Sequence, residues 1–102
     1  MKNPMTLTAN KALSILKAAK PELERRYGVT QLALFGSTVR GEARTDSDVD
    51  VYVAFAGSAD SRRYFGVQFY LEDAFQRPVD LVTEKALRPQ LKPYIEREAR
   101  HV

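Results

Sequence analysis

The sequence predicts a small α/β (α+β) domain, in which a mixed β-sheet of three or more strands is flanked by helices. Apolar residues at helical spacing near the start predict an amphipathic helix, and strict apolar–polar alternation over 48–55 predicts a strand. A second helical stretch separates that strand from a short apolar segment over 79–82. Alternating helices and strands are typical of a sheet covered by helices. At 102 residues the chain is expected to form one domain spanning 1–102.

The first helix is predicted over 8–27 from the spacing of its leucines. Thr8 is placed to cap its start, and Gly28 is placed to end it. Pro21 interrupts the pattern, so that either the helix kinks there or two short helices abut there.

The other predicted elements follow along the chain. They are a short strand over 31–35, a short helix beginning at Gly36, a polar loop over 41–47, a strand over 49–55, a turn over 57–60, a helix over 62–75, a strand over 79–82 and a last helix over 94–100. In the second of these strands the valines are expected to face the core, which turns Asp48 and Asp50 toward a site on the other face.

The aromatic side chains of the helix predicted over 62–75 fall into two groups. Phe65, Phe69 and Phe75 are expected in the core. Tyr64 and Tyr70 are left open between the core and a surface that binds a partner.

Composition excludes several classes of protein. There is no cysteine, so neither a disulfide framework nor a thiolate metal site is available. The chain has no long apolar stretch and no apolar region near its start, so we expect a cytoplasmic protein without a membrane contact. Its net charge is +3, with acidic and basic residues interleaved, so nucleic acid is not expected as a direct ligand. The single histidine, His101, is expected to be a solvated residue near the end of the chain.

Gly36 and Ser37 directly follow a predicted strand and are candidates for binding a phosphate. A glycine at such a turn lets the backbone approach a phosphate closely, and Ser37 adds a hydroxyl. By themselves they favour an ordinary turn with Ser37 as a helix cap. Gly36 and Gly41 match the spacing of a P-loop, but Glu42 and Ala43 stand where that motif requires Lys and Ser or Thr, which rejects it.

Three aspartates are the candidate metal ligands. Asp48 and Asp50 are two positions apart on one strand and so share a face. Asp80 lies within an otherwise apolar strand, where an unpaired charge would be costly. Three carboxylates on two neighbouring strands can hold two divalent ions, and hard oxygen ligands suit Mg²⁺.

Two arginines flank the loop between the Gly-Ser pair and the aspartates. Arg40 and Arg44 could each neutralise phosphate charge. Alternatively, either could be solvated or could pair with Glu42 or Asp46.

The chain closely resembles the minimal nucleotidyltransferase family of the polymerase-β superfamily over two segments, LALFGSTVRGEARTDSDVDVYV and RPVDLVTEKALRP. The family is marked by Gly-Ser, then Asp-x-Asp after ten residues, and a later third Asp. The resemblance assigns phosphate binding to Gly36 and Ser37, metal binding to Asp48 and Asp50, and the third carboxylate to Asp80.

The resemblance has further implications for ligands and partners. Small members of the family are the antitoxins of HEPN-domain RNase toxins, in type VII-like toxin–antitoxin pairs. The resemblance implies that this chain is such an antitoxin and transfers AMP from ATP to a tyrosine of the toxin (AMPylation). It also implies two Mg²⁺ ions or, alternatively, Mn²⁺. Asp80 would also help to activate the tyrosine hydroxyl. Thr38 stands where many relatives carry Arg, while Arg40 matches the second basic position of the family.

Two other functions remain open from the sequence. The chain could be a non-catalytic antitoxin that neutralises its partner by binding, through the aromatic surface near 64–75. It could also be a nucleotidyltransferase that acts on RNA or a small molecule, although it lacks an additional domain to hold either.

Overall fold

The computed structural model describes residues 7–40, 48–57, 60–86 and 89–102. Along the chain the elements are α1 (Ala9–Tyr27), β1 (Val29–Phe35), the 3-10 helix η1 (Gly36–Thr38), β2 (Val49–Phe55), α2 (Ser61–Phe75), β3 (Val79–Thr83), α3 (Lys92–Glu98) and β4 (Arg100–His101). The predicted loop over 41–47, with Arg44, and part of the turn over 57–60 lie outside the described residues. No helix in the described ranges is long and apolar enough to cross a membrane.

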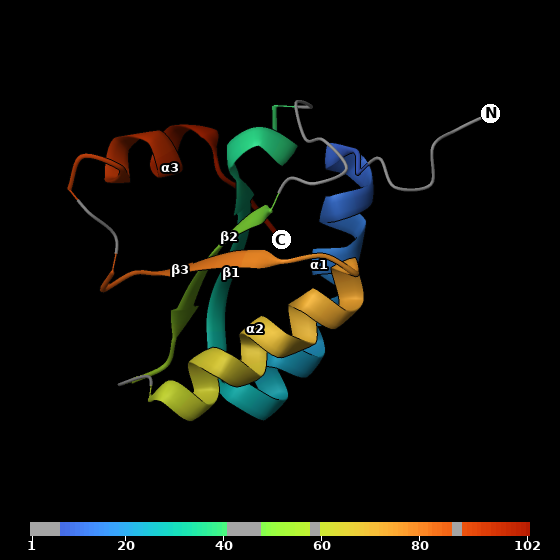
Figure 1. Cartoon of the computed structure of the whole chain (residues 1–102). Coiled ribbons are helices and arrows are strands. Elements are labelled where there is room, and N and C mark those ends of the chain that lie inside the picture. Colours follow the sequence, from blue (N-terminus) through green and yellow to red (C-terminus); the bar gives the residue numbers. More distant parts are fainter. Residues whose placement is uncertain (1–6, 41–47, 58–59, 87–88) are drawn as a thin grey trace.

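The four strands form one mixed sheet in the order β3-β2-β1-β4 (Figure 1). β2 pairs with β1 antiparallel and with β3 parallel, and β4 pairs antiparallel with the outer side of β1. The predicted fold class, a mixed sheet flanked by helices, is therefore confirmed.

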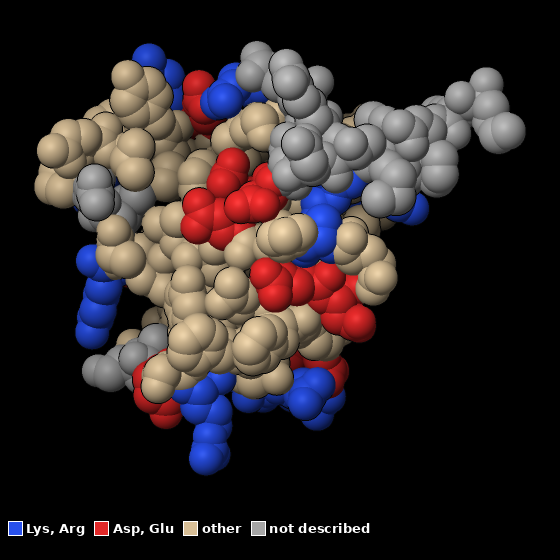
Figure 2. Space-filling model, in the orientation of Figure 1, with Lys and Arg blue, Asp and Glu red and all other residues tan. Residues whose placement is uncertain are grey.

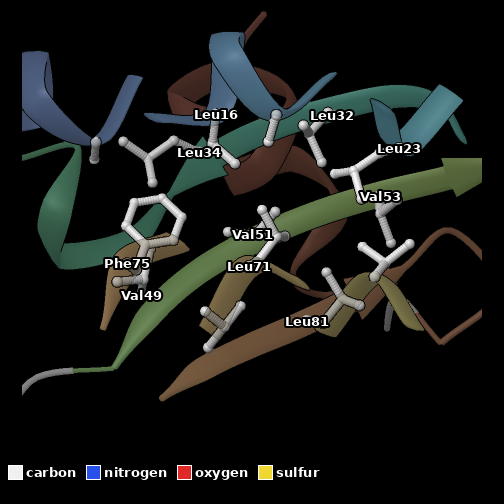
Figure 3. Close-up of a cluster of buried hydrophobic side chains, with 14 of the residues drawn as sticks. Leu16, Leu23, Leu32, Leu34, Val49, Val51, Val53, Leu71, Phe75 and Leu81 are labelled. Carbon is white, nitrogen blue, oxygen red and sulfur yellow. The ribbon is translucent and has the colours of Figure 1, made fainter. Parts of the chain in front are cut away.

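The two faces of the sheet bury different residues. Leu32, Leu34 and the valines of β2 pack against α1 and α2, where Leu16, Leu23 and Leu71 are fully buried (Figure 3). Burying side chains of this size contributes about 1.5–3 kcal/mol each. On the other face a smaller cluster forms around Ile95 of α3, from Ala33, Tyr52 and Ala54. Asp50 alternates with the valines of β2 and so belongs to the α3 face.

α1 is one continuous helix that contains Pro21, rather than two abutting helices. The Thr8 side chain accepts a hydrogen bond from the Lys11 backbone N–H, as expected of a cap. Gly28, at φ +69°, ends the helix in the left-handed conformation. Both predicted ends are confirmed.

Two predictions for the second long helix are wrong. Phe65 and Phe69 are 48% and 64% exposed, and their rings stack with centroids 6.2 Å apart. The buried stripe of α2 follows Val67, Leu71 and Phe75 instead, so only Phe75 of the three phenylalanines lies in the core.

The end of the chain also differs from expectation. The last helix is α3, which begins at Lys92 and ends at Glu98, and it is followed by the unpredicted strand β4. His101 is exposed, as expected, but it pairs with Ala33 of β1 and its ring meets Tyr52 edge-on. Two residues are too few to show a strand pattern in the sequence.

α2 lies along the outer edge of β3 and forms hydrogen bonds with three of its backbone groups. Tyr64 donates its hydroxyl to the Leu81 carbonyl at 2.8 Å, and Gln68 donates to the Val79 carbonyl at 3.3 Å. Glu72 accepts from the Val79 N–H at 3.1 Å. The three side chains are four residues apart, one turn of helix each, so that a single face of α2 holds β3 in place.

Candidate active site

Asp50 of β2 and Asp80 of β3 occupy facing positions in the parallel pair of strands. Both alternate with core residues, since Val49, Val51 and Leu81 are buried on the opposite face. The two carboxyl groups therefore emerge side by side on the α3 face, and Figure 2 shows acidic atoms gathered in this region of the surface. Asp48, one residue before β2, is exposed. The structure thus places Asp50 and Asp80 side by side, and Asp48 is near enough to influence Asp50 electrostatically.

The pKa of Asp50 shows how closely the three groups interact. It is raised from 3.8 to about 6, first by partial burial and then by the negative charges of Asp80 and Asp48. A hydrogen bond with Asp80 raises it further, whereas the positive charge of Arg40 lowers it. At neutral pH this carboxylate is ionised in a setting that disfavours its charge, and a cation would relieve that cost.

Gly36 lies directly against Asp50. A Cβ built on Gly36 would overlap the Asp50 carboxylate, and the backbone there has φ +77°, in the left-handed region. Both observations require glycine at this position. The chain thereby turns from β1 into η1 within reach of the carboxylates.

The residues after Gly36 differ in their exposure. Ser37 is half-buried in the middle of η1, and the residue at its cap is Phe35, so Ser37 is not the helix cap considered from the sequence. The Thr38 side chain is fully buried, and among the described residues its hydroxyl has no hydrogen-bond partner. Thr38 is therefore no substitute for the arginine that the family resemblance leads one to expect at this position.

Arg40 pairs with Glu98 of α3, its Nη1 lying 3.1 Å from Oε2. Glu42 and Asp46, the partners considered from the sequence, lie outside the described residues. Because 58 positions separate Arg40 from Glu98, no local spacing could have indicated their pairing. The pair joins α3 to the segment that follows η1 and keeps the arginine within electrostatic range of Asp50.

The donor chemistry of this site fits a divalent ion, because all three carboxylates offer hard oxygen ligands. Within the described ranges, however, no three His, Cys, Asp or Glu side chains converge closely enough to hold one. Two observations support a metal site here: Asp50 and Asp80 face each other, and the pKa of Asp50 is raised by neighbouring negative charge. A complete set of ligands is not already arranged around one point among the described residues.

Comparison with known proteins agrees with this fold. The family described as "Nucleotidyltransferase domain" matches residues 16–102. The protein adenylyltransferase MntA of Thermococcus cleftensis is 40% identical over 96 residues, covering 94% of this chain and 97% of that protein.

Solved structures give the same result. A proposed minimal nucleotidyltransferase superposes with a TM-score of 0.78 at 33% identity, over 91% of this chain and 94% of its own. A toxin–antitoxin structure with AMP-PNP has a TM-score of 0.69 at 23% identity, covering 83% of this chain and 70% of its own. A complex of a tri-AMPylated HEPN toxin of Shewanella oneidensis with its MNT antitoxin has a TM-score of 0.57 at 22% identity, covering 95% of this chain and 70% of its own. At these last two identities the likeness shows the fold alone.

The fold and the matched residues define a nucleotidyltransferase. The chain belongs to the nucleotidyltransferase domain family, as a homologue of the MntA protein adenylyltransferases. The family resemblance expected from the sequence is confirmed, and so is its class of enzyme.

Proposed function

We propose that this chain transfers AMP from ATP to a tyrosine of a HEPN-domain toxin and thereby acts as the antitoxin of that protein. The observation that carries the proposal is the facing pair Asp50 and Asp80 beside Gly36. The relative named as a protein adenylyltransferase supports a protein as the acceptor. The matched complex of an AMPylated HEPN toxin supports the kind of partner.

In this proposal Asp48, Asp50 and Asp80 would hold two Mg²⁺ ions, for which Mn²⁺ could substitute. The ions would neutralise the triphosphate and lower the pKa of the attacking hydroxyl. The backbone at Gly36 and the hydroxyl of Ser37 bind phosphate oxygens. Arg40 adds positive charge on the same side.

The reaction is a displacement at the α-phosphorus of ATP. The tyrosine oxygen forms a bond to that phosphorus, and the bond from the phosphorus to the oxygen that bridges to the β-phosphate breaks. Pyrophosphate leaves with the electron pair, and the tyrosine proton passes to a carboxylate oxygen of Asp80. The products are AMP-tyrosine on the partner and pyrophosphate.

The test is a labelling experiment with the purified chain, Mg²⁺ and α-labelled ATP in lysate of the native host. We compare the wild type with Asp48→Asn/Asp50→Asn. Asp73→Asn, on the exposed side of α2, controls for loss of a carboxylate. We expect the wild type and Asp73→Asn to label one small protein, and mass spectrometry to find AMP on a tyrosine. Label on RNA or a small molecule, or undiminished label with the double variant, would contradict the proposal.

A second candidate function is neutralisation of the partner by binding alone. The exposed, stacked rings of Phe65 and Phe69 favour it, because large apolar side chains at a surface are typical of protein interfaces. Under this alternative, Asp48→Asn/Asp50→Asn protects cells from the toxin as well as the wild type does. Under AMP transfer, the double variant loses protection while it still binds the toxin.

A further inference from the structure

A hollow of about 350 Å³ lies between α3 and the turn from β1 into η1. Phe35 and Gly36 form one side of it, and Leu91, Tyr94 and Ile95 form the other. Figure 1 shows α3 and η1 at the same end of the sheet. The volume is within the range of small-ligand sites, about 300–1,000 Å³, and most of the lining is apolar.

Two of the side chains at this hollow are exposed although they are large and apolar. Tyr94 is 58% exposed and Leu91 is 46% exposed. The Arg97 guanidinium lies 5.8 Å from the centroid of the Tyr94 ring. An aromatic face beside an aliphatic side chain is the surface on which nucleobases stack.

The position of the hollow indicates which part of a ligand would enter it. Gly36 belongs both to the hollow and to the candidate phosphate site against Asp50. A nucleotide with its phosphates at Gly36 therefore has its ribose and base next to this space. A similar hollow of about 380 Å³ at the far end of β2, near Phe55 and Phe65, contains neither Gly36 nor Arg40.

Arg40 and Glu98, which form an ion pair, lie at one side of the hollow. Their contact joins the end of α3 to the segment after η1. Arg40 therefore lies between the two regions, close enough to Asp50 to influence its charge. A nucleoside triphosphate matches this arrangement, with an apolar base, a polar ribose and an anionic tail.

We propose that the hollow between η1 and α3 binds the purine base of ATP, which stacks on Tyr94. This inference rests on the proposed function, since it assigns the base subsite of the same nucleotide. The base is then held by α3, from the C-terminal part of the chain, while the phosphates are held by η1. Tyr94 is a binding residue in this arrangement and takes no part in the chemical step.

The experiment measures direct binding of a non-hydrolysable ATP analogue and of inorganic triphosphate, each with Mg²⁺, by calorimetry. We compare the wild type, Tyr94→Ala and Tyr94→Phe. Phe69→Ala, which truncates an equally exposed ring on α2, is the control. We expect Tyr94→Ala to weaken binding of the analogue about tenfold and of triphosphate less than about twofold. Tyr94→Phe and Phe69→Ala should bind both probes as the wild type does.

Other outcomes separate failure of this inference from failure of the proposed function. If the wild type binds the analogue and Tyr94→Ala binds it equally well, the base is not on Tyr94. Equal loss of both probes also overturns the inference, because the effect then does not pass through the base. If Tyr94→Ala binds the analogue normally but transfers AMP to the partner protein more slowly, the hollow would be a binding site for the partner and not for the base. If the wild type binds no analogue, the proposed function fails as well.

Discussion

Gly36 and the Asp50 carboxylate are in such close contact that a methyl group at Gly36 would overlap Asp50 Oδ2. The contact joins the candidate phosphate-binding turn to the candidate metal ligands. It follows from the sheet itself, since Phe35, one residue earlier, pairs with Asp50 across β1 and β2.

Replacement of this glycine should disable the site. Gly36→Ala must displace the Asp50 carboxylate or the turn, so we expect nucleotide transfer to fall by about 100-fold or more. Gly57→Ala is the matched control, because Gly57 also has a positive φ, +67°, but a Cβ there meets no described atom within 4 Å. Both variants should lose about 1–2 kcal/mol of stability from backbone strain. Equal activity of the two variants would show that the contact with Asp50 is unimportant.

The raised pKa of Asp50 predicts how stability depends on pH without metal. The folded protein holds the proton more tightly than the unfolded chain, whose value is near 3.8. Stability is therefore lost as the pH rises from about 4 to about 6, and the loss is complete above that window. Since water screens a half-buried carboxylate, we expect a penalty of about 1 kcal/mol at pH 7.5. In EDTA, Asp50→Asn should remove it and be more stable than the wild type in urea unfolding. A less stable variant at pH 7.5 would contradict this.

Divalent ions should reverse the same penalty. Mg²⁺ or Mn²⁺ needs the ionised carboxylate, so the ion should raise the thermal unfolding midpoint of the wild type by a few degrees at pH 7.5. The increase should be smaller at pH 5, where Asp50 is mostly protonated. Asp73→Asn should behave as the wild type does, and Asp50→Asn should show little response. An equal increase with Asp50→Asn would place the ion elsewhere.

Arg40 should matter for ATP binding more than for stability. Its ion pair with Glu98 is exposed, so Arg40→Ala should change the free energy of unfolding by less than about 1 kcal/mol. The loss of its positive charge should weaken ATP binding about tenfold. Arg25→Ala removes a comparable surface pair, with Glu22, far along α1, and should bind ATP normally. Equal binding by both variants would exclude a role for Arg40.

Gly66 is required for the packing of α2 on α1. A Cβ at this position would overlap the ring of Tyr27, so Gly66→Ala should lower the free energy of unfolding by about 1–3 kcal/mol. The better helix propensity of alanine, about 1 kcal/mol, offsets only part of this. In a Tyr27→Ala background the cost of Gly66→Ala should disappear in chemical denaturation. A cost that persists there would have another origin.

Local pattern was sufficient to predict much of this molecule. Alternation along β2 identified the face that carries Asp50, and Thr8 and Gly28 marked both ends of α1. What could not be predicted depends on contacts between distant parts of the chain. To predict that Asp50 and Asp80 face each other, one must know the register of β2 and β3. To predict that Arg40 pairs with Glu98, one must know where α3 lies. Phe65 and Phe69 have helical spacing, but spacing alone cannot say which stripe of α2 meets the sheet.

The side chains of α2 along β3 have a consequence for assembly. An edge strand with free backbone groups invites another strand to pair with it, which leads to aggregation or to binding by strand addition. Here Tyr64 and Gln68 already bond the carbonyl groups of Leu81 and Val79, and Glu72 bonds the N–H group of Val79. Around Val79 and Leu81 the outer edge of β3 is therefore covered by α2, which disfavours pairing with another strand on the side of Asp80.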